Sequence, residues 1–289
     1  MNARQSPFRP WRAFAFLGML ALAAGCAAGP EARRGTAEEI AAGAGLVPRL
    51  YPAAPFTLAG WLRAGGSGRN GGPLVAYIEG DGYGWVTPER PSRDPTPRNP
   101  VALRLAARDP AERVLYLGRP CQYVGASVEP ACGNRYWTSH RFAPEVVGAL
   151  GRALDAAKRD SGAERLILAG YSGGGVLAAL LAARRTDVDG LLTVAAPLDH
   201  AAWTRRHGIT PLAGSLNAAD AADALAGLPQ LHLAGAEDRV VPPDLVRSFA
   251  ARIGAPVRVV AGVDHGGDWA ALWPELRAAL ALPAPHPRP

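Results

Sequence analysis

The sequence predicts an α/β fold with a mostly parallel sheet, helices on both faces and an antiparallel hairpin at one edge. Short apolar runs bounded by turn residues alternate along the chain with helical patterns, which is typical of such a sheet. The chain has 289 residues, of which 48% are hydrophobic. This is enough for one substantial core and too little for two of typical size, so we expect a single domain.

The expected strands lie at Phe56–Leu62, Leu74–Ile78, Val114–Leu117, Leu166–Ala169, Leu191–Val194, Leu231–Ala234 and Val257–Ala261. The expected helices lie between most of them, at Pro100–Ala107, Pro144–Lys158, Val176–Arg184, Asp244–Ile253 and Trp269–Leu280. Residues 63–73, which join the first two strands, are too few for a crossover helix. We therefore expect these two strands to form the antiparallel hairpin.

Two longer stretches interrupt the alternation, at Val86–Asn99 and Pro197–Pro229. Long loops after strand ends commonly shape a substrate pocket, and we expect this role here. The alternative is that they are surface connections without contact to a substrate.

The amino terminus has the layout of an export signal, in which Arg4, Arg9 and Arg12 precede an apolar run from Ala13 to Ala24. The run is too short to span a bilayer by itself. We divide the chain into a signal peptide over residues 1–25, a tether rich in Ala, Gly and Glu over residues 26–50, and a domain over residues 51–283.

The residues before Cys26 resemble the bacterial lipobox, in which the cysteine becomes the lipidated first residue of the mature chain. The usual leucine three residues before the cysteine is replaced by Ala23, and Leu22 lies one step earlier. An ordinary signal peptide with an incidental cysteine is the alternative. Either case predicts export to the cell envelope, and lipidation predicts an anchored protein facing the periplasm.

Export would expose Cys121 and Cys132 to an oxidising compartment, so we predict a disulfide between them; two unpaired buried thiols are the alternative. Neither C-x-x-C nor H-E-x-x-H occurs, so no metal site is expected. The net charge of +6 includes the three arginines of the export segment and gives no support to a nucleic-acid partner.

Gly170-Tyr171-Ser172-Gly173-Gly174 follows an apolar strand and opens an apolar helix. A nucleophilic serine needs this context, because its hydroxyl must stand clear of the backbone at a strained corner between strand and helix. The residues two before and two after it must be small for the strand and helix to pass closely, and Gly170 and Gly174 meet that demand.

A serine hydroxyl becomes a good nucleophile when an imidazole takes its proton and a carboxylate orients the imidazole. Asp238 follows the predicted strand Leu231–Ala234, and His265 follows the last predicted strand. Glu237, which is next to Asp238, and Asp199, which follows an earlier predicted strand, are alternative acids. Each of the three expected site residues could also have a purely structural role.

The order Ser172, Asp238, His265 is that of the α/β-hydrolase family, and the chain resembles this family from about Phe56 to Leu280. More narrowly it looks like uncharacterised bacterial lipoprotein-type members, through the segments 79–82, 119–123 and 136–138. The resemblance implies hydrolysis without naming a substrate.

Such chemistry needs two backbone N–H groups aimed at the developing oxyanion. The family pattern places one at Gly173 and the other in the glycine-rich turn after Leu74–Ile78, at Asp81 with Gly82 as the alternative. Many members carry His-Gly in that turn, where this chain has Glu79 and Gly80. The turn lacks the spacing and helix of a dinucleotide fingerprint, so no cofactor is expected.

We therefore expect a serine hydrolase that cleaves a carboxylic ester or related acyl bond of a small molecule through an acyl-enzyme. An acyltransferase would use the same triad but exclude water. A non-catalytic binding protein on the same fold is the other alternative, since fold does not fix function.

Overall fold

The computed structural model describes residues 29–66, 72–125 and 130–278. In chain order the elements are α1 (Pro30–Gly43), β1 (Val47–Ala53), β2 (Phe56–Arg63), β3 (Leu74–Ile78), β4 (Trp85–Thr87), β5 (Arg90–Pro91), α2 (Val101–Arg108), β6 (Val114–Leu117), η1 (Asn134–Trp137), α3 (Pro144–Ser161), β7 (Leu166–Tyr171), α4 (Gly173–Ala182), β8 (Val188–Val194), α5 (His200–His207), η2 (Ala218–Ala221), α6 (Ala222–Leu225), β9 (Gln230–Gly235), α7 (Pro243–Ile253), β10 (Val257–Val260) and α8 (Trp269–Ala278).

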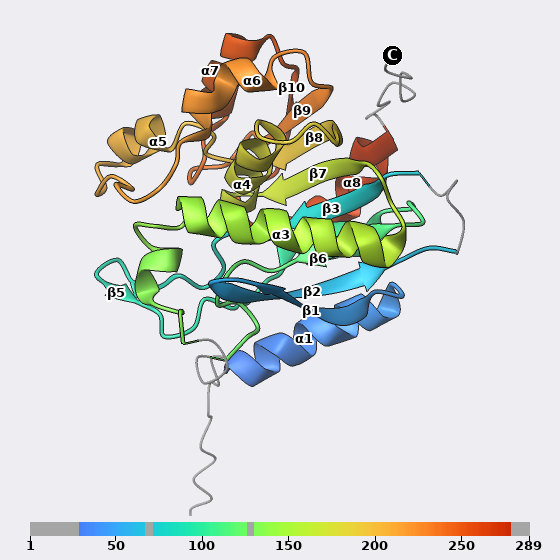
Figure 1. The fold of residues 1–289 in the computed structure, drawn as a ribbon. Helices are drawn as coiled ribbons and strands as arrows, with labels where there is room; N and C mark the ends of the chain where they lie inside the picture. Colours follow the sequence, from blue (N-terminus) through green and yellow to red (C-terminus); the bar gives the residue numbers. More distant parts are fainter. Residues whose placement is uncertain (1–28, 67–71, 126–129, 279–289) are drawn as a thin grey trace, which may run out of the picture.

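The central sheet has eight strands in the order β1-β2-β6-β3-β7-β8-β9-β10. Strand β2 pairs antiparallel with both β1 and β6, and all the other pairings are parallel. Helices α3, α4 and α7 cover one face of the sheet, and α2 with its neighbours α1 and α8 covers the other (Figure 1). The predicted α/β class is therefore confirmed.

Strand β3 lies in the middle of the sheet and is buried on both faces. Leu74, Ala76 and Ile78 face the core under α3 and α4, whereas Val75 and Tyr77 face the core under α1, α2 and α8. This alternation follows from the two-residue period of a strand. A strand with two apolar faces appears in the sequence as the continuous apolar run from which it was predicted.

The predicted hairpin between Phe56–Leu62 and Leu74–Ile78 is wrong. Strand β6 lies between β2 and β3 and is hydrogen-bonded to both, and the hairpin partner of β2 is β1. Strand β1 contains Pro48 and Pro52, which interrupt the apolar pattern. Proline is tolerated there because β1 is at the edge of the sheet, where fewer backbone N–H groups must pair.

The expected tether over residues 26–50 is also wrong from Pro30 onward, because helix α1 packs on the domain (Figure 1). Ala37 and Ala41 are fully buried on its inner face, and the buried Arg33 donates to the carbonyl of Thr96. Alanine packs closely but contributes little to a hydrophobic pattern, which explains why the sequence did not indicate this helix. Cys26 and the predicted signal peptide lie outside the described residues.

A disulfide joins Cys121 to Cys132, as the sequence predicts, with Cα atoms 5.6 Å apart. It links the loop after β6 to the segment that leads into η1. Within the described ranges, no helix combines the length and apolar character needed to cross a bilayer.

Candidate active site

Ser172 lies at the sharp turn between β7 and α4, with a φ angle of 51° and a ψ angle of −123°. A side chain at Gly170 would overlap the carbonyl oxygen of Gly174, and one at Gly174 would overlap that of Ile78. The two glycines therefore allow strand and helix to meet closely enough to hold Ser172 in this strained conformation.

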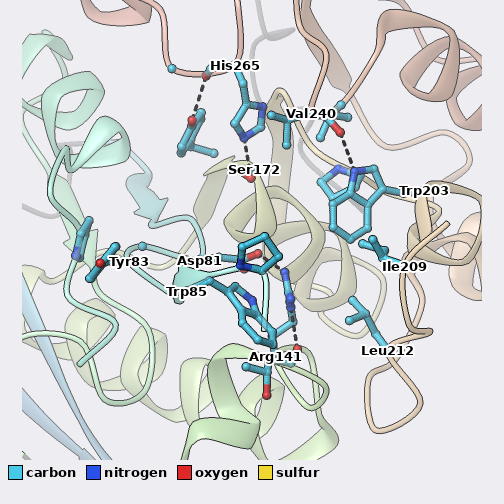
Figure 2. Close-up of a pocket in the computed structure, with 18 of the residues that line it drawn as sticks. Asp81, Tyr83, Trp85, Arg141, Ser172, Trp203, Ile209, Leu212, Val240 and His265 are labelled. Atoms are coloured by element: carbon cyan, nitrogen blue, oxygen red, sulfur yellow. Dashed lines mark hydrogen bonds and ion pairs between the residues drawn. The ribbon is translucent and has the colours of Figure 1, made fainter. Parts of the chain in front are cut away.

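His265 lies in the loop between β10 and α8, and its Nε2 is 3.1 Å from the Ser172 Oγ. Its Nδ1 is 2.8 Å from the Oδ2 of Asp238, which follows β9. The carboxylate accepts from Nδ1–H and so leaves the Nε2 lone pair free for the serine proton. The structure thus brings the three sequence-predicted residues into a continuous chain, and Figure 2 shows His265 directly above Ser172.

The Asp238 side chain is fully buried. Its Oδ1 accepts hydrogen bonds from the backbone N–H groups of Val240 and Val241, at 2.8 and 2.7 Å. These bonds orient the other carboxylate oxygen toward His265. The alternative acid Asp199 instead caps α5 by accepting from the Ala202 N–H at 3.0 Å, and the alternative Glu237 is exposed.

The histidine loop is held by two further hydrogen bonds. The carbonyl of His265 accepts from the Tyr171 hydroxyl at 2.9 Å and from the Trp269 Nε1 at 3.2 Å. The rings of Tyr171 and His265 also lie 5.4 Å apart between centroids. The imidazole therefore has little freedom to leave Ser172.

The turn after β3 places Asp81 beside Gly173, the two residues expected to supply the oxyanion donors. As the first residue of α4, Gly173 has an N–H with no acceptor inside the helix. The Asp81 N–H likewise has no acceptor among the described residues. The Asp81 carboxylate does not point into open space, because it forms ion pairs with Arg119 and Arg141.

No family model matches the sequence, and no curated protein matches it. Solved structures do match. Est1E from Butyrivibrio proteoclasticus is 14% identical with a TM-score of 0.56, over 81% of this chain and 95% of that one. An alpha-beta serine hydrolase homologue from Coxiella burnetii is 19% identical with a TM-score of 0.54, over 81% and 94%. XC6422 from Xanthomonas campestris, an α/β serine hydrolase without a lid, is 16% identical with a TM-score of 0.52, over 83% and 97%.

The chain has the α/β-hydrolase fold. Identities this low establish the fold alone, so the chemistry of the site rests on its own geometry. Within that fold, Ser172 lies at the corner between β7 and α4. Asp238 and His265 lie on later loops, after β9 and β10, at the same edge of the sheet, which is the chain order expected for this fold.

A cavity of about 1120 Å³ opens in front of Ser172 and His265. The two long stretches predicted to shape a pocket both line it, one through Val86 and Pro97 and the other through Trp203 and Leu212. The walls are mainly apolar, and Figure 2 shows Trp85 facing Trp203, Ile209 and Leu212 across the cavity. Such a pocket accommodates an apolar group of considerable size.

Arg141 and the two ion pairs of Asp81 were not predicted from the sequence, although Asp81 and Glu79 were named there. Burial raises the pKa of Glu79 to about 7, against the opposing effect of hydrogen bonds from the Gly80 N–H and the Tyr116 hydroxyl. Burial would also raise the pKa of Asp81, but the Arg141 and Arg119 guanidiniums outweigh it and hold that pKa below its ordinary value. Arg141 follows η1 and lies just outside the segment 136–138, so no motif identified in the sequence includes it.

No group of three His, Cys, Asp or Glu side chains in the described part of the chain is arranged to hold a metal ion.

Proposed function

We propose that this α/β-hydrolase-fold protein is a serine hydrolase that cleaves a carboxylic ester or a related acyl bond. The observation that carries the proposal is the hydrogen-bonded chain from Ser172 through His265 to the buried Asp238. A serine at a strained corner, an imidazole within reach and a carboxylate that fixes its tautomer are the three parts of nucleophilic acyl transfer.

In the proposed reaction the Ser172 Oγ attacks the acyl carbonyl while its proton moves to the His265 Nε2. Asp238 stabilises the imidazolium through Nδ1–H, and the N–H groups of Gly173 and Asp81 receive the oxyanion. His265 then protonates the leaving alcohol, which leaves an acyl group on Ser172. Water, deprotonated by His265, attacks the acyl carbonyl and releases the acid, and the proton returns to Ser172.

The structural neighbours support a hydrolase activity, and the compounds named with them differ. One structure of Est1E holds ferulic acid, another neighbour is a puromycin hydrolase, and a third is a serine hydrolase involved in carbazole degradation. Because the compounds named with these proteins differ, they support the class of reaction and not a substrate. The large apolar cavity favours a small molecule with an apolar acyl or alcohol part.

We also propose that the protein is exported and anchored in the cell envelope through lipidated Cys26, facing the periplasm. The disulfide between Cys121 and Cys132 supports an oxidising compartment. Mass spectrometry of the mature amino terminus tests this proposal: a diacylglyceryl group on Cys26 is expected, and an unmodified cysteine would contradict it.

The proposed activity is tested by treating the protein with a fluorophosphonate probe and reading the labelled residue by mass spectrometry. We expect labelling of Ser172 and none in the Ser172→Ala variant. Ser139→Ala is the matched control, because Ser139 lines the same cavity and its hydroxyl lies 2.8 Å from the His140 Nδ1. Persistent labelling of a folded Ser172→Ala variant would overturn the assignment.

A further inference from the structure

The cavity holds a second set of charged groups besides the catalytic chain. Arg119 Nη1 pairs with one oxygen of the Asp81 carboxylate and Arg141 Nη1 with the other. Two guanidiniums thus share one carboxylate. Since arginine remains protonated in proteins, the cluster has a net charge of +1.

Arg141 and Asp81 are the members of this cluster that line the cavity together with Ser172. The Arg141 Nε donates to the Thr138 carbonyl at 2.7 Å and its Nη1 to Asp81, and no described residue accepts from its Nη2. The side chain is only 10% exposed, so this free donor is largely shielded from bulk water. Figure 2 shows Arg141 and Asp81 directed toward one another below Ser172.

Glu79, the acid that lines the cavity besides Asp81, offsets this positive charge only in part. Among the described residues that line the cavity, Asp81 and Glu79 are the only acids. The Glu79 oxygens are already occupied by the Gly80 N–H at 2.8 Å and the Tyr116 hydroxyl at 3.0 Å, and burial raises its pKa to about 7. Glu79 is therefore partly protonated near neutral pH, so it offsets only part of the excess positive charge.

A second cation lies at the mouth of the cavity. Arg98 lines the opening, is exposed, and has its guanidinium 3.7 Å from the centroid of the Tyr83 ring. No acid within the described ranges pairs with it. A negatively charged group entering the cavity would thus pass Arg98 and reach Arg141, whose Nη2 has no acceptor among the described residues although its Nη1 pairs with Asp81.

We propose that Arg141, assisted by Arg98, binds a carboxylate of the substrate, so that the preferred acyl donors carry this anionic group in addition to the bond that is cleaved. The inference rests on the proposed function and names its substrate class. The free Nη2 of Arg141 can donate a charge-assisted hydrogen bond to a carboxylate oxygen, and such a bond is strengthened where water is excluded.

Two esters of equal chain length separate charge from size. 4-Nitrophenyl hydrogen adipate carries the carboxylate, and methyl 4-nitrophenyl adipate is its neutral counterpart. We expect kcat/KM to be at least about tenfold higher for the acidic ester in the wild type. Arg141→Gln is expected to reduce this ratio to near 1, Arg98→Gln to reduce it in part, and Arg141→Lys to retain part of it.

The matched control is Arg247→Gln, which removes the same charge from an exposed site on α7 away from the cavity. Its ratio should equal that of the wild type. If Arg141→Gln slowed both esters equally, the cluster would only hold the turn and the inference would be wrong. A wild-type ratio near 1 with good cleavage of the neutral ester would also overturn it.

A protection assay keeps the inference testable if neither ester is cleaved. Monomethyl adipate is expected to slow fluorophosphonate labelling of Ser172 in the wild type but not in Arg141→Gln, and neutral dimethyl adipate to slow it in neither. Equal protection by both compounds would count against the carboxylate site. Absence of any labelling would instead contradict the proposed hydrolase activity.

Discussion

The Asp81 carboxylate lies against the α-carbon of Gly173, so that a side chain at position 173 would overlap Asp81 Oδ1. The residue after Ser172 is thus a glycine for a local reason, since the turn after β3 places the Asp81 side chain in that space. The same contact directs the carboxylate toward Arg119 and Arg141. The two expected oxyanion donors are therefore coupled through the Asp81 side chain.

Gly173→Ala is predicted to displace Asp81 and to lower kcat by about 10²- to 10³-fold, comparable to the loss of one oxyanion donor. Steady-state kinetics on a 4-nitrophenyl ester checks the rate, and circular dichroism checks the fold. Gly151→Ala is the control, because its added methyl would meet only Leu181 Cδ2 at 3.7 Å. Full activity of Gly173→Ala would show that the contact has no role.

The arrangement of Ser172, His265 and Asp238 was predictable from the sequence because each of these residues follows an apolar strand. Strands β3 and β6 have the bounds that their apolar runs predict, and Ser172, Asp238 and His265 lie beyond the ends of three later strands. Parallel strands bring their carboxyl ends to one edge of the sheet. Order along the chain was therefore sufficient to bring these residues together.

The parts that were missed depend on contacts between distant segments. Arg141 is 60 residues from Asp81 along the chain, and no spacing rule joins them. Helix α1 packs through small residues such as Ala37, and β1 is an edge strand interrupted by Pro48. Such features become visible only when the partner surface is known.

The buried Glu79 predicts a specific pH dependence of stability. Its pKa in the folded protein is about 7, so between its ordinary value and pH 7 the folded state binds more protons than the unfolded state. The contribution of Glu79 to the free energy of unfolding is thus highest at low pH and falls as pH rises through about 7. Glu79→Gln should remove this slope and be more stable than the wild type at pH 8, by roughly 2 to 3 kcal/mol.

Urea unfolding of both proteins at pH 5 and pH 8 measures this difference. Only the change between wild type and variant is compared, because other buried groups have pH dependences of their own. Burial lowers the pKa of His232 to about 4, which contributes stability that is lost as pH falls. A wild type and variant that respond equally to pH would show that Glu79 ionises normally.

The disulfide between Cys121 and Cys132 is expected to stabilise the fold, and this can be tested independently of the active site. Replacing Cys121 and Cys132 together by serine is expected to lower the free energy of unfolding by about 3 kcal/mol, because the crosslink restricts the unfolded chain. Urea unfolding with and without reductant checks this. Reductant should lower the free energy of unfolding of the wild type to about that of the double variant and should leave that of the variant unchanged. If reductant did not change the free energy of unfolding of the wild type, the expected contribution of the disulfide would be contradicted.

Asp238 and Asp199 provide a matched pair for testing which carboxylate serves His265. In Asp238→Asn the amide oxygen can still accept from the N–H groups of Val240 and Val241, which places the NH₂ group against the His265 Nδ1. The imidazole must then carry its proton on Nε2, where it cannot accept one from Ser172.

The variant is therefore expected to fold normally and to lose about 10³- to 10⁴-fold in kcat with little change in KM. Asp199→Asn should keep nearly full activity, since Asp199 caps α5 and pairs with Arg252. Steady-state kinetics and fluorophosphonate labelling rates on both variants decide between the two acids. A greater loss in Asp199→Asn than in Asp238→Asn would show that the hydrogen bond to His265 at 2.8 Å is not the one that orients the base.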